Sequence, residues 1–330
     1  MVGADHLHVF SLVEGLLSAG ADPVAHLRSG DLIGLYEGWQ TTSEARSLGD
    51  ILDDPAVGLV VLVGVASERA SVAVAAIDRG KAVLSAKPGI TSRPQLEAVR
   101  EALAGRSGRP WTVLFSERFE NRAIARAVEL ARAGAIGQIV HVAGSGPHSL
   151  MADQRPDWFW DPDRSGGILV DIGSHQIDQF AALVGDPSAV QVDRSLVGNV
   201  ACAEHPSMQD VGTMTLLAPG VVGEHRVDYL SPTGLDTWGD VRLSVVGTAG
   251  TIEVRANIDV TGAPGAEHLI LVDADGARRI DVSNDERQWA NHLLSDLVDD
   301  GERLMTQEHV LTVCDLSLQA QERAAGWGSR

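Results

Sequence analysis

The first third of the chain alternates short apolar runs with stretches of helical periodicity. Unbroken apolar runs of strand length predict strands that are buried on both faces. Strands that alternate with helices in this way are typical of βαβ units and of a doubly wound parallel sheet. The predicted strands are 23–27, 58–64, 82–86 and 112–117, and the predicted helices are 7–19, 47–54, 67–79 and 92–105.

The strand that should open this sheet is nearly absent. A strand of about five residues is expected before Gly3, yet only Met1 and Val2 precede it. The first strand of a doubly wound sheet is central, so its loss would leave backbone groups of its neighbours unpaired. We therefore expect a truncated first strand. Our hypothesis is that Met1 is an internal methionine of a longer natural strand, which mass spectrometry of the protein from its native source would test.

Beyond residue 184 the pattern changes to alternating apolar and polar positions. Turn residues at 218–220, 247–250 and 273–276 predict hairpins, and therefore a large, mostly antiparallel open sheet. The later predicted strands are 136–144, 189–197, 211–218, 221–230, 241–247, 250–256, 268–273 and 277–282, with helices 121–134, 284–299 and 306–325. A chain of 330 residues exceeds what one core usually supports. We expect a Rossmann-type domain over 1–119 and an α+β domain over 120–330.

Charge and cysteine content narrow the class of function. The 45 acidic residues outnumber the 26 Lys and Arg and give a net charge of -19, which disfavours nucleic-acid or anionic-membrane binding. Cys202 and Cys314 form no CxxC motif, as fits a reducing compartment. No apolar run approaches the roughly 20 residues of a membrane-spanning helix. We expect a cytoplasmic protein that acts on small molecules.

Asp171 and His175 stand four positions apart in the glycine-led segment 165–178. On one helix they would lie one turn apart on the same face. A carboxylate and an imidazole in that arrangement could transfer a proton to or from a bound hydroxyl. Lys87, between a buried strand and Pro88, could stabilise a developing alkoxide. The competing interpretation is a surface or capping pair, and no third ligand indicates a metal site.

The turn after the truncated strand retains only the first glycine of a GxGxxG motif. Asp5 would bring negative charge close to dinucleotide phosphates, and an ordinary strand-to-helix turn is the competing interpretation. Segment 26–29 offers no carboxylate for a ribose diol, whereas Arg28 and Ser29 could meet a 2′-phosphate. This tilts the coenzyme prediction weakly from NAD to NADP, although Arg28 could equally be a solvated surface charge.

The stretch from Arg79 to Pro88 (RGKAVLSAKP) resembles the glucose-fructose oxidoreductase / inositol dehydrogenase (Gfo/Idh/MocA) family, whose members typically show AGKHVLxEKP here. The resemblance begins near residue 43 and runs through Arg118, Phe119 and segment 134–140. It ends in GGILVDIGSH (166–175), which is similar to the family's GGGxLxDxGxH. Two departures stand out. The glutamate before the lysine is Ala86 here, and the family's TPNxLH aligns with 64–69, so its polar and histidine side chains are absent.

The resemblance implies a Rossmann domain that binds NAD or NADP, followed by a domain whose open sheet commonly forms a dimer or tetramer. It implies catalytic roles for Lys87, Asp171 and His175. His175 would be the base, Lys87 would stabilise the alkoxide, and Asp171 would orient His175 or bind a second hydroxyl. The expected coenzyme-binding residues are Gly3, Asp5, His6, Leu7, Arg28, Ser29, Val65, Ala66, Ala86 and Lys87.

A loop rich in aromatic and charged residues, 155–164, precedes the segment with Asp171. Its Trp158 and Trp160 could form the wall of a polyol site, or could simply pin the loop to the core. The expected substrate neighbours are His8, Arg118, His148, Trp158 and Trp160. We predict an NAD(P)-dependent oxidoreductase acting on a hydroxyl or carbonyl of a sugar, cyclitol or related polyol. The alternative is an inactive family member that senses a ligand or has a regulatory role. The degenerate GxGxxG motif would favour this alternative.

Overall fold

The computed structural model describes residues 1–106 and 111–327, which form two compact units. Unit 1 comprises Met1–Leu114, Pro156–Gly166 and Gln288–Cys314. Unit 2 comprises Phe115–Arg155, Gly167–Arg287 and the chain from Asp315 onward. Two later segments therefore fold with the N-terminal part of the chain.

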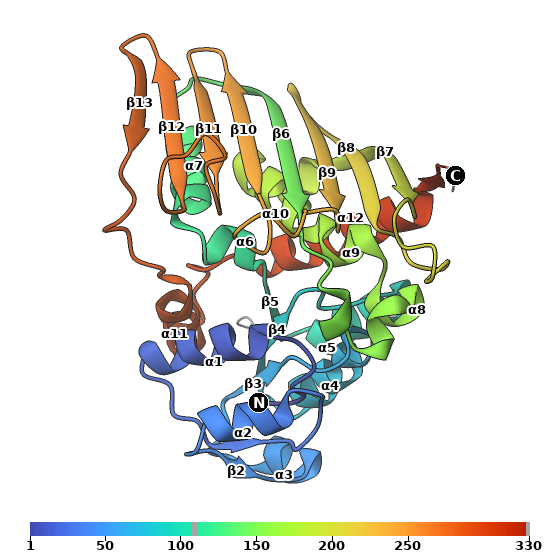
Figure 1. The fold of residues 1–330 in the computed structure, drawn as a ribbon. Coiled ribbons are helices and arrows are strands. Elements are labelled where there is room, and N and C mark those ends of the chain that lie inside the picture. The colour runs from blue at the N-terminus through green and yellow to red at the C-terminus, as the bar shows by residue number, and fades with distance from the viewer. Residues whose placement is uncertain (107–110, 328–330) are drawn as a thin grey trace. The chain divides into compact units, whose positions relative to one another are not determined.

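Unit 1 is built on parallel strands flanked by helices. Strands β3 (Leu59–Leu62), β4 (Ala82–Ala86) and β5 (Trp111–Leu114) form one parallel sheet, and β1 (Ala25–His26) pairs with β2 (Glu44–Ala45) in another (Figure 1). The parallel sheet predicted from the unbroken apolar runs is thus confirmed. The helices of this unit are α1 (His8–Ser18), α2 (Ile33–Trp39), α3 (Leu48–Asp53), α4 (Ala66–Asp78), α5 (Arg93–Leu103), η2 (Asp157–Trp160), α8 (Pro162–Ser165) and α11 (Trp289–Asp299).

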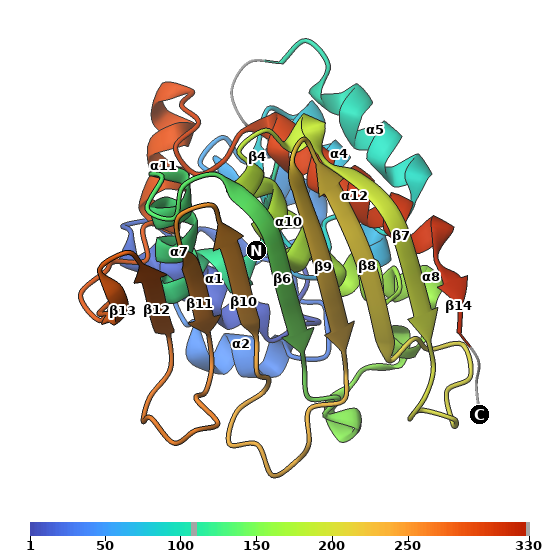
Figure 2. The same cartoon turned by 90° about the horizontal axis from the view of Figure 1, so that it is seen from above.

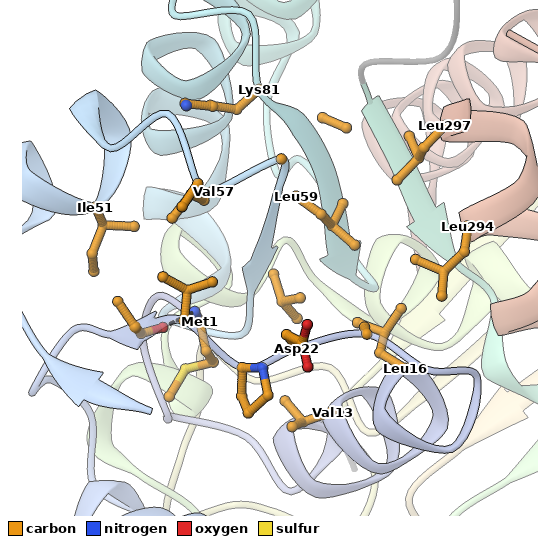
Figure 3. Close-up of a pocket in the computed structure, with 18 of the residues that line it drawn as sticks. Met1, Val13, Leu16, Asp22, Ile51, Val57, Leu59, Lys81, Leu294 and Leu297 are labelled. Carbon is orange, nitrogen blue, oxygen red and sulfur yellow. Dashed lines mark hydrogen bonds between the residues drawn. The ribbon is translucent and has the colours of Figure 1, made fainter. Parts of the chain in front are cut away.

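The first strand is reduced to a stub between these two sheets. Val2 forms a single parallel bridge with Leu62. The nitrogen of Met1 donates to the Ala25 carbonyl at 2.8 Å, and its carbonyl accepts from the Leu27 amide at 2.9 Å. Beside Met1 lies a mainly apolar cavity of about 790 Å³ (Figure 3). The parallel strands of unit 1 thus form two sheets, one of two strands and one of three.

Unit 2 contains a nine-stranded sheet in the order β13-β12-β11-β10-β6-β9-β8-β7-β14 (Figure 2). Neighbouring strands are antiparallel except for the pairs β6/β9 and β7/β14, which are parallel. The predicted large, mostly antiparallel sheet is confirmed. Its strands are β6 (Ile139–Pro147), β7 (Gln191–Gly198), β8 (Val211–Ala218), β9 (Val221–Asp228), β10 (Arg242–Gly247), β11 (Thr251–Arg255), β12 (His268–Asp273), β13 (Gly276–Ile280) and β14 (Ala325–Gly326).

Helix α10 (Gly173–Val184) packs closely on the inner face of this sheet because glycines line its path. A Cβ atom on Gly144 would lie 2.2 Å from Oε1 of Gln176, and one on Gly223 would lie 2.6 Å from the Phe180 ring. Such distances are far inside van der Waals contact, so a Cβ atom at either position would displace the Gln176 or Phe180 side chain that packs there. The other helices of this unit are α6 (Ser116–Phe119), α7 (Arg122–Arg132), η1 (Ala152–Gln154), α9 (Ile168–Asp171) and η3 (Pro187–Ala189), while α12 (Gln307–Arg323) is shared with unit 1.

The prediction of one continuous helix through Asp171 and His175 is wrong. Helix α9 ends at Asp171, and α10 begins at Gly173. The His175 amide bonds to the Ile172 carbonyl three residues back, and the Ser174 hydroxyl donates to the Asp171 carbonyl at 3.2 Å. A serine side chain that takes a backbone carbonyl competes with the helical hydrogen-bond ladder. The two side chains therefore belong to consecutive helices.

Other predicted elements differ at their ends. Residues Ser116 and Glu117, expected in a strand, lie in the short helix α6, and α2 was not predicted. The expected loop after 144 begins later, because β6 continues to Pro147 and His148 bridges to Gly239. Among residues 1–106 and 111–327, no helix has the length and apolar character needed to cross a bilayer.

A buried histidine lies beneath the sheet of unit 2. His225 on β9 is 4% exposed and packs edge-on against Phe180, with ring centroids 5.7 Å apart. Within the described residues neither of its ring nitrogens has a hydrogen-bond partner. Burial, and next the charge of the nearby His141, lowers the pKa of His225 to about 3. The native state therefore holds this ring neutral at any moderately acidic pH.

We expect His225 to make the protein sensitive to acid. The unfolded chain takes up a proton as the pH falls through about 6.5, whereas the folded chain does not, so the free energy of unfolding falls by about 1.4 kcal/mol per pH unit below 6.5. Urea unfolding of the wild type and of His225→Leu, near pH 7.5 and near pH 5, measures this term. The variant should lose about 2 kcal/mol less than the wild type over that interval. Equal losses would show that His225 is not responsible.

Candidate active site

A partly buried hydrogen bond joins Asp171 to a tyrosine that was not expected at the site. The Tyr229 hydroxyl donates to Oδ2 of Asp171 at 2.5 Å. Tyr229 is 7% exposed and follows β9 directly. Burial, and next the charge of Asp171, raises the pKa of Tyr229 well above its ordinary value, while Arg155 partly offsets this. The hydroxyl therefore remains a donor at neutral pH and holds the Asp171 carboxylate in place.

Aromatic and cationic side chains surround this pair within unit 2. The Arg155 guanidinium lies 5.6 Å from the Tyr229 ring centroid, and its Nε donates to the Leu150 carbonyl at 2.7 Å. The His148 ring is 6.5 Å from the Tyr229 ring on one side and 4.6 Å from the Trp238 ring on the other. Trp238 is 45% exposed. Because β6 and β9 run parallel, His148 and Tyr229 leave the sheet at the same edge.

A second polar cluster lies under His148. The buried carboxylate of Glu117 accepts hydrogen bonds from the side-chain amides of Gln176 at 3.0 Å and Gln179 at 2.8 Å. Its other oxygen is 4.0 Å from Nε2 of His148, and Nδ1 of that histidine lies 3.1 Å from the Gly146 carbonyl. These contacts fix the orientation of the imidazole. His148 is thus held in contact with the tyrosine that bonds Asp171, and its place near substrate stays a prediction.

The other two predicted site residues of unit 2 are His175 and Arg118. His175 is 2% exposed and is the third residue of α10, three positions beyond the break at Ile172. Arg118, expected near substrate, pairs with the fully buried Asp178 through two hydrogen bonds of 2.7 and 2.6 Å and stacks on Phe119. These contacts give Arg118 a structural role in joining α6 to α10.

In unit 1, Lys87 follows the last residue of β4 and is 6% exposed. Its backbone is held by Arg69 of α4, a residue that sequence reasoning did not select. The Arg69 guanidinium donates to the carbonyls of Gly64, Ala86, Lys87 and Pro88 at 2.7 to 3.0 Å. Val65, Ala66 and Ala86 flank the same clamp, because Val65 is the N-cap of α4, Ala66 begins that helix and Ala86 ends β4.

The turn before α1 keeps the tight geometry of a dinucleotide-binding turn. Gly3 has φ +74°, and a Cβ atom there would lie 2.3 Å from Cα of Gly64, so only glycine fits. The Ala4 amide donates to the Ser29 carbonyl at 2.9 Å. The turn and the helix start that follows it fit a dinucleotide phosphate. Asp5 opposes this charge, and burial followed by the charge of Asp31 raises the pKa of its carboxyl group.

Arg28 is not available as a free cation for a 2′-phosphate. Its Nε lies 2.7 Å from Oε1 of Glu37, and its Nη2 donates to Oε2 at 3.0 Å. Glu37 also contacts Nε2 of His26 at 3.0 Å. Hydrogen bonds from Arg28 and His26 lower the pKa of Glu37, which therefore stays ionised. The carboxylate missing from the end of the strand is supplied by α2.

The structure assigns the predicted residues to the two units as follows. His6 and His8 lie together at the start of α1, with ring centroids 4.1 Å apart, and Leu7 beside them is 55% exposed. Trp158 and Trp160 fold with unit 1, whereas Asp171 belongs to unit 2. Unit 1 holds Gly3, Asp5, His6, Leu7, His8, Arg28, Ser29, Val65, Ala66, Ala86, Lys87, Trp158 and Trp160, and unit 2 holds Arg118, His148, Asp171 and His175.

Sequence reasoning missed the aromatic and charged partners of these residues. Tyr229 carried one available signal, since it lies near the end of the predicted strand 221–230 and is one of two tyrosines in the chain. Arg155 stood in the noted aromatic loop, but its position over Tyr229 depends on a long-range contact. Glu37 and Trp238 carried no local signal. In the part of the chain that the structure describes, no group of three potential ligands could hold a metal ion.

Known proteins resemble the chain in sequence and in fold. A family model described as the GFO/IDH/MocA C-terminal domain matches residues 124–253. The scyllo-inositol 2-dehydrogenase (NAD(+)) of Bacillus subtilis is 25% identical over 229 residues, which cover 68% of this chain and 64% of that protein. Levoglucosan dehydrogenase of Pseudarthrobacter phenanthrenivorans is 31% identical over 156 residues, or 46% and 38% of the two chains. Both matches span less than two thirds of the curated relative.

Solved structures match over nearly the whole length. An oxidoreductase-type structure from Erwinia carotovora atroseptica is 32% identical, has a TM-score of 0.93 and covers 99% of this chain and 98% of its own. Levoglucosan dehydrogenase in complex with NADH and levoglucosan shares the fold at 17% identity and a TM-score of 0.79, over 98% and 96% of the two chains. Fold and relatives define a two-domain oxidoreductase class. The chain belongs to the glucose-fructose oxidoreductase / inositol dehydrogenase (Gfo/Idh/MocA) family.

We expect Asp171 and Tyr229 to be energetically coupled. A hydrogen bond to a charged acceptor contributes about 1.5–3 kcal/mol, so Tyr229→Phe should lower the free energy of unfolding by about that amount. In an Asp171→Asn background the same change should cost less, because the charged acceptor is already gone. Urea unfolding of both single variants and the double variant gives the coupling energy, expected above about 0.5 kcal/mol. Additive effects would contradict a direct interaction.

Proposed function

We propose that the protein is an NAD-dependent dehydrogenase that oxidises a secondary hydroxyl of a sugar, cyclitol or related small polyol, or reduces the corresponding carbonyl. The observation that carries this proposal is the Asp171 carboxylate, held by Tyr229 beside the aromatic wall of His148 and Trp238. The named activities of the relatives, on scyllo-inositol and levoglucosan, support it.

The reaction needs three functional groups from the protein. A bound nicotinamide coenzyme supplies the acceptor for the hydride. His175 takes the proton from the substrate hydroxyl, since an imidazole titrates in the right range. The Lys87 ammonium stabilises the negative charge that develops on the same oxygen. Asp171, fixed by Tyr229, accepts a hydrogen bond from a neighbouring substrate hydroxyl and so selects a vicinal diol or polyol.

The aromatic wall favours a ring-shaped polyol. One face of a sugar or cyclitol ring presents C–H groups, which pack well against an exposed indole, while its hydroxyls reach polar side chains. Trp238 offers such a surface, and Arg155 and Asp171 offer polar groups within the same unit. An open-chain polyol would lose more conformational freedom in the same place.

The coenzyme proposal is NAD rather than NADP. A carboxylate that accepts from the ribose diol favours NAD, and a free arginine favours the 2′-phosphate of NADP. Arg28 is paired with Glu37, so an incoming phosphate dianion would meet a carboxylate before it met a free cation. The NADH complexes of levoglucosan dehydrogenase support this choice, and they replace the tilt toward NADP expected from sequence.

We also propose that the chain forms a homo-oligomer through the outer face of the nine-stranded sheet. Alternation along the strands directs one set of side chains away from α10. That set is partly apolar and includes Thr213, Thr215, Leu217, Val222, Val246, Ile270 and Val272. Val222 is 40% and Val272 36% exposed. Light scattering of the purified chain should give more than the monomer mass, and a monomer would exclude this interface.

Replacing Lys87 or His175 should remove turnover and spare coenzyme binding. We expect Lys87→Ala and His175→Ala to lower kcat about 100-fold or more, because each removes one charge-stabilising or proton-transfer group. Spectrophotometric assays with NAD and a panel of inositols and pyranoses measure kcat, and fluorescence titration measures NADH affinity. Lys81→Ala is a matched control, since Lys81 is the only other lysine of the chain and bonds the Asp54 carbonyl. Unchanged kcat in either variant would remove that residue from the mechanism.

Replacing Glu37 should relax the coenzyme preference. In Glu37→Gln the Arg28 guanidinium is released, so the ratio of NADPH to NADH affinity should rise about tenfold, equal to about 1.4 kcal/mol. Isothermal titration of the wild type and the variant gives both affinities. Glu44→Gln is the control, because it also removes a carboxylate paired with an arginine in this unit. Failure of the wild type to bind either coenzyme would favour the alternative of a ligand-sensing protein.

A further inference from the structure

One buried arginine of unit 1 donates hydrogen bonds to main-chain carbonyls. Arg69 on α4 is 2% exposed. Its Nε donates to the Gly64 carbonyl at 2.7 Å, and its Nη1 lies 3.0, 2.8 and 3.0 Å from the carbonyls of Ala86, Lys87 and Pro88. Burying a guanidinium is costly unless its donors are satisfied. Here main-chain oxygens accept from Nε and Nη1.

These carbonyls belong to the ends of two neighbouring strands. Gly64 lies just beyond β3, and Ala86 to Pro88 end β4, which pairs in parallel with β3. A guanidinium is planar and presents its donors in a fixed fork, whereas an ammonium is a compact point charge on a flexible stem. Arg69 therefore fixes the end of β4 against the end of β3 in a way that lysine could not reproduce.

The carbonyl of Lys87 itself is one of the acceptors. Fixing the carbonyls before, at and after Lys87 fixes the direction in which its side chain leaves the strand. A displacement of the order of 1 Å in a reacting group can cost about 100-fold in rate. The clamp therefore acts on the part of unit 1 where such precision matters most.

Arg69 also connects this strand end to the dinucleotide-type turn. The Gly64 carbonyl accepts a hydrogen bond from Nε of Arg69. Gly64 also packs against Gly3 so closely that a Cβ atom on Gly3 would lie 2.3 Å from the Gly64 Cα. The positive charge of Arg69 lowers the pKa of Asp5, against the upward effect of burial. One side chain thus braces both the turn and the lysine, and balances the carboxylate between them.

We propose that Arg69 is a positioning residue for Lys87, which it serves by clamping the three carbonyls of the Ala86–Pro88 segment. This inference rests on the role proposed above for Lys87. It predicts effects on the lysine itself, not only on the stability of the fold.

The most direct test reads Lys87 without requiring turnover. The chain contains two lysines, so competitive labelling with trace acetic anhydride, read by mass spectrometry, compares Lys87 with Lys81 as an internal reference. In Arg69→Met the labelling rate of Lys87 relative to Lys81 should change at least about threefold across neutral to alkaline pH, because the ammonium moves into a new environment. Arg79→Met is the matched control: Arg79 follows the same helix but pairs with Asp53 at the surface.

The kinetic arm uses the same variants. Arg69→Met should lower kcat about 10- to 100-fold with NADH affinity within about twofold of wild type, whereas Arg79→Met should leave both unchanged. In Arg69→Ala, added guanidinium at low millimolar concentration should restore part of kcat, an effect that general loss of stability would not produce. Should Arg69→Met fail to fold, Arg69→Lys keeps the charge but not the fork and should show the same labelling change in weaker form.

An unchanged Lys87 labelling rate in a folded Arg69 variant would overturn the proposal. So would equal kinetic effects of the Arg69 and Arg79 substitutions. Altered labelling in an enzyme for which Lys87→Ala keeps full kcat would instead support the clamp and refute the catalytic role of Lys87. Failure of the inference and failure of the proposed function therefore give different results.

Discussion

The parallel pairing of β6 with β9 is the constraint on which the site of unit 2 depends. Most neighbours in this sheet are antiparallel, and antiparallel strands place their ends at opposite edges. Because β6 and β9 run in the same direction, with Pro147 opposite Asp228, the residues that follow each strand leave at one edge. His148 and Tyr229 are those residues. Without this pairing, Asp171 would have neither its hydroxyl donor nor its aromatic neighbours.

The glycines beneath α10 serve the same arrangement. Gly144 and Gly223 let the helix lie close to the strands, which brings Gln176 and Gln179 within reach of Glu117. The buried carboxylate in turn lies near His148. The close approach of the backbones thus allows a polar network that orients the His148 imidazole. This network is built on helices and strands, which place a reacting group more precisely than loops do.

Local patterns predicted much of the fold. Strands 82–86, 211–218 and 268–273 have the predicted bounds, because each is an apolar or alternating run enclosed by turn residues. The break between α9 and α10 escaped prediction, since it depends on a competing bond from Ser174 that periodicity does not reveal. The partners Tyr229, Glu37 and Arg69 escaped for another reason. Their contacts join segments separated in sequence, and one sequence carries no record of such pairs.

The split in the parallel sheet has a consequence for how unit 1 responds to ligands. Within the described chain, Met1 and Val2 lie between the β1–β2 ribbon and β3: Met1 bonds to Ala25 and Leu27, and Val2 bridges Leu62. Arg28 and Ser29 follow β1, Lys87 follows β4, and Gly3 lies in the segment between the two sheets. A dinucleotide that contacts both sheets would link them non-covalently. Part of its binding energy would then make the two sheets unfold together.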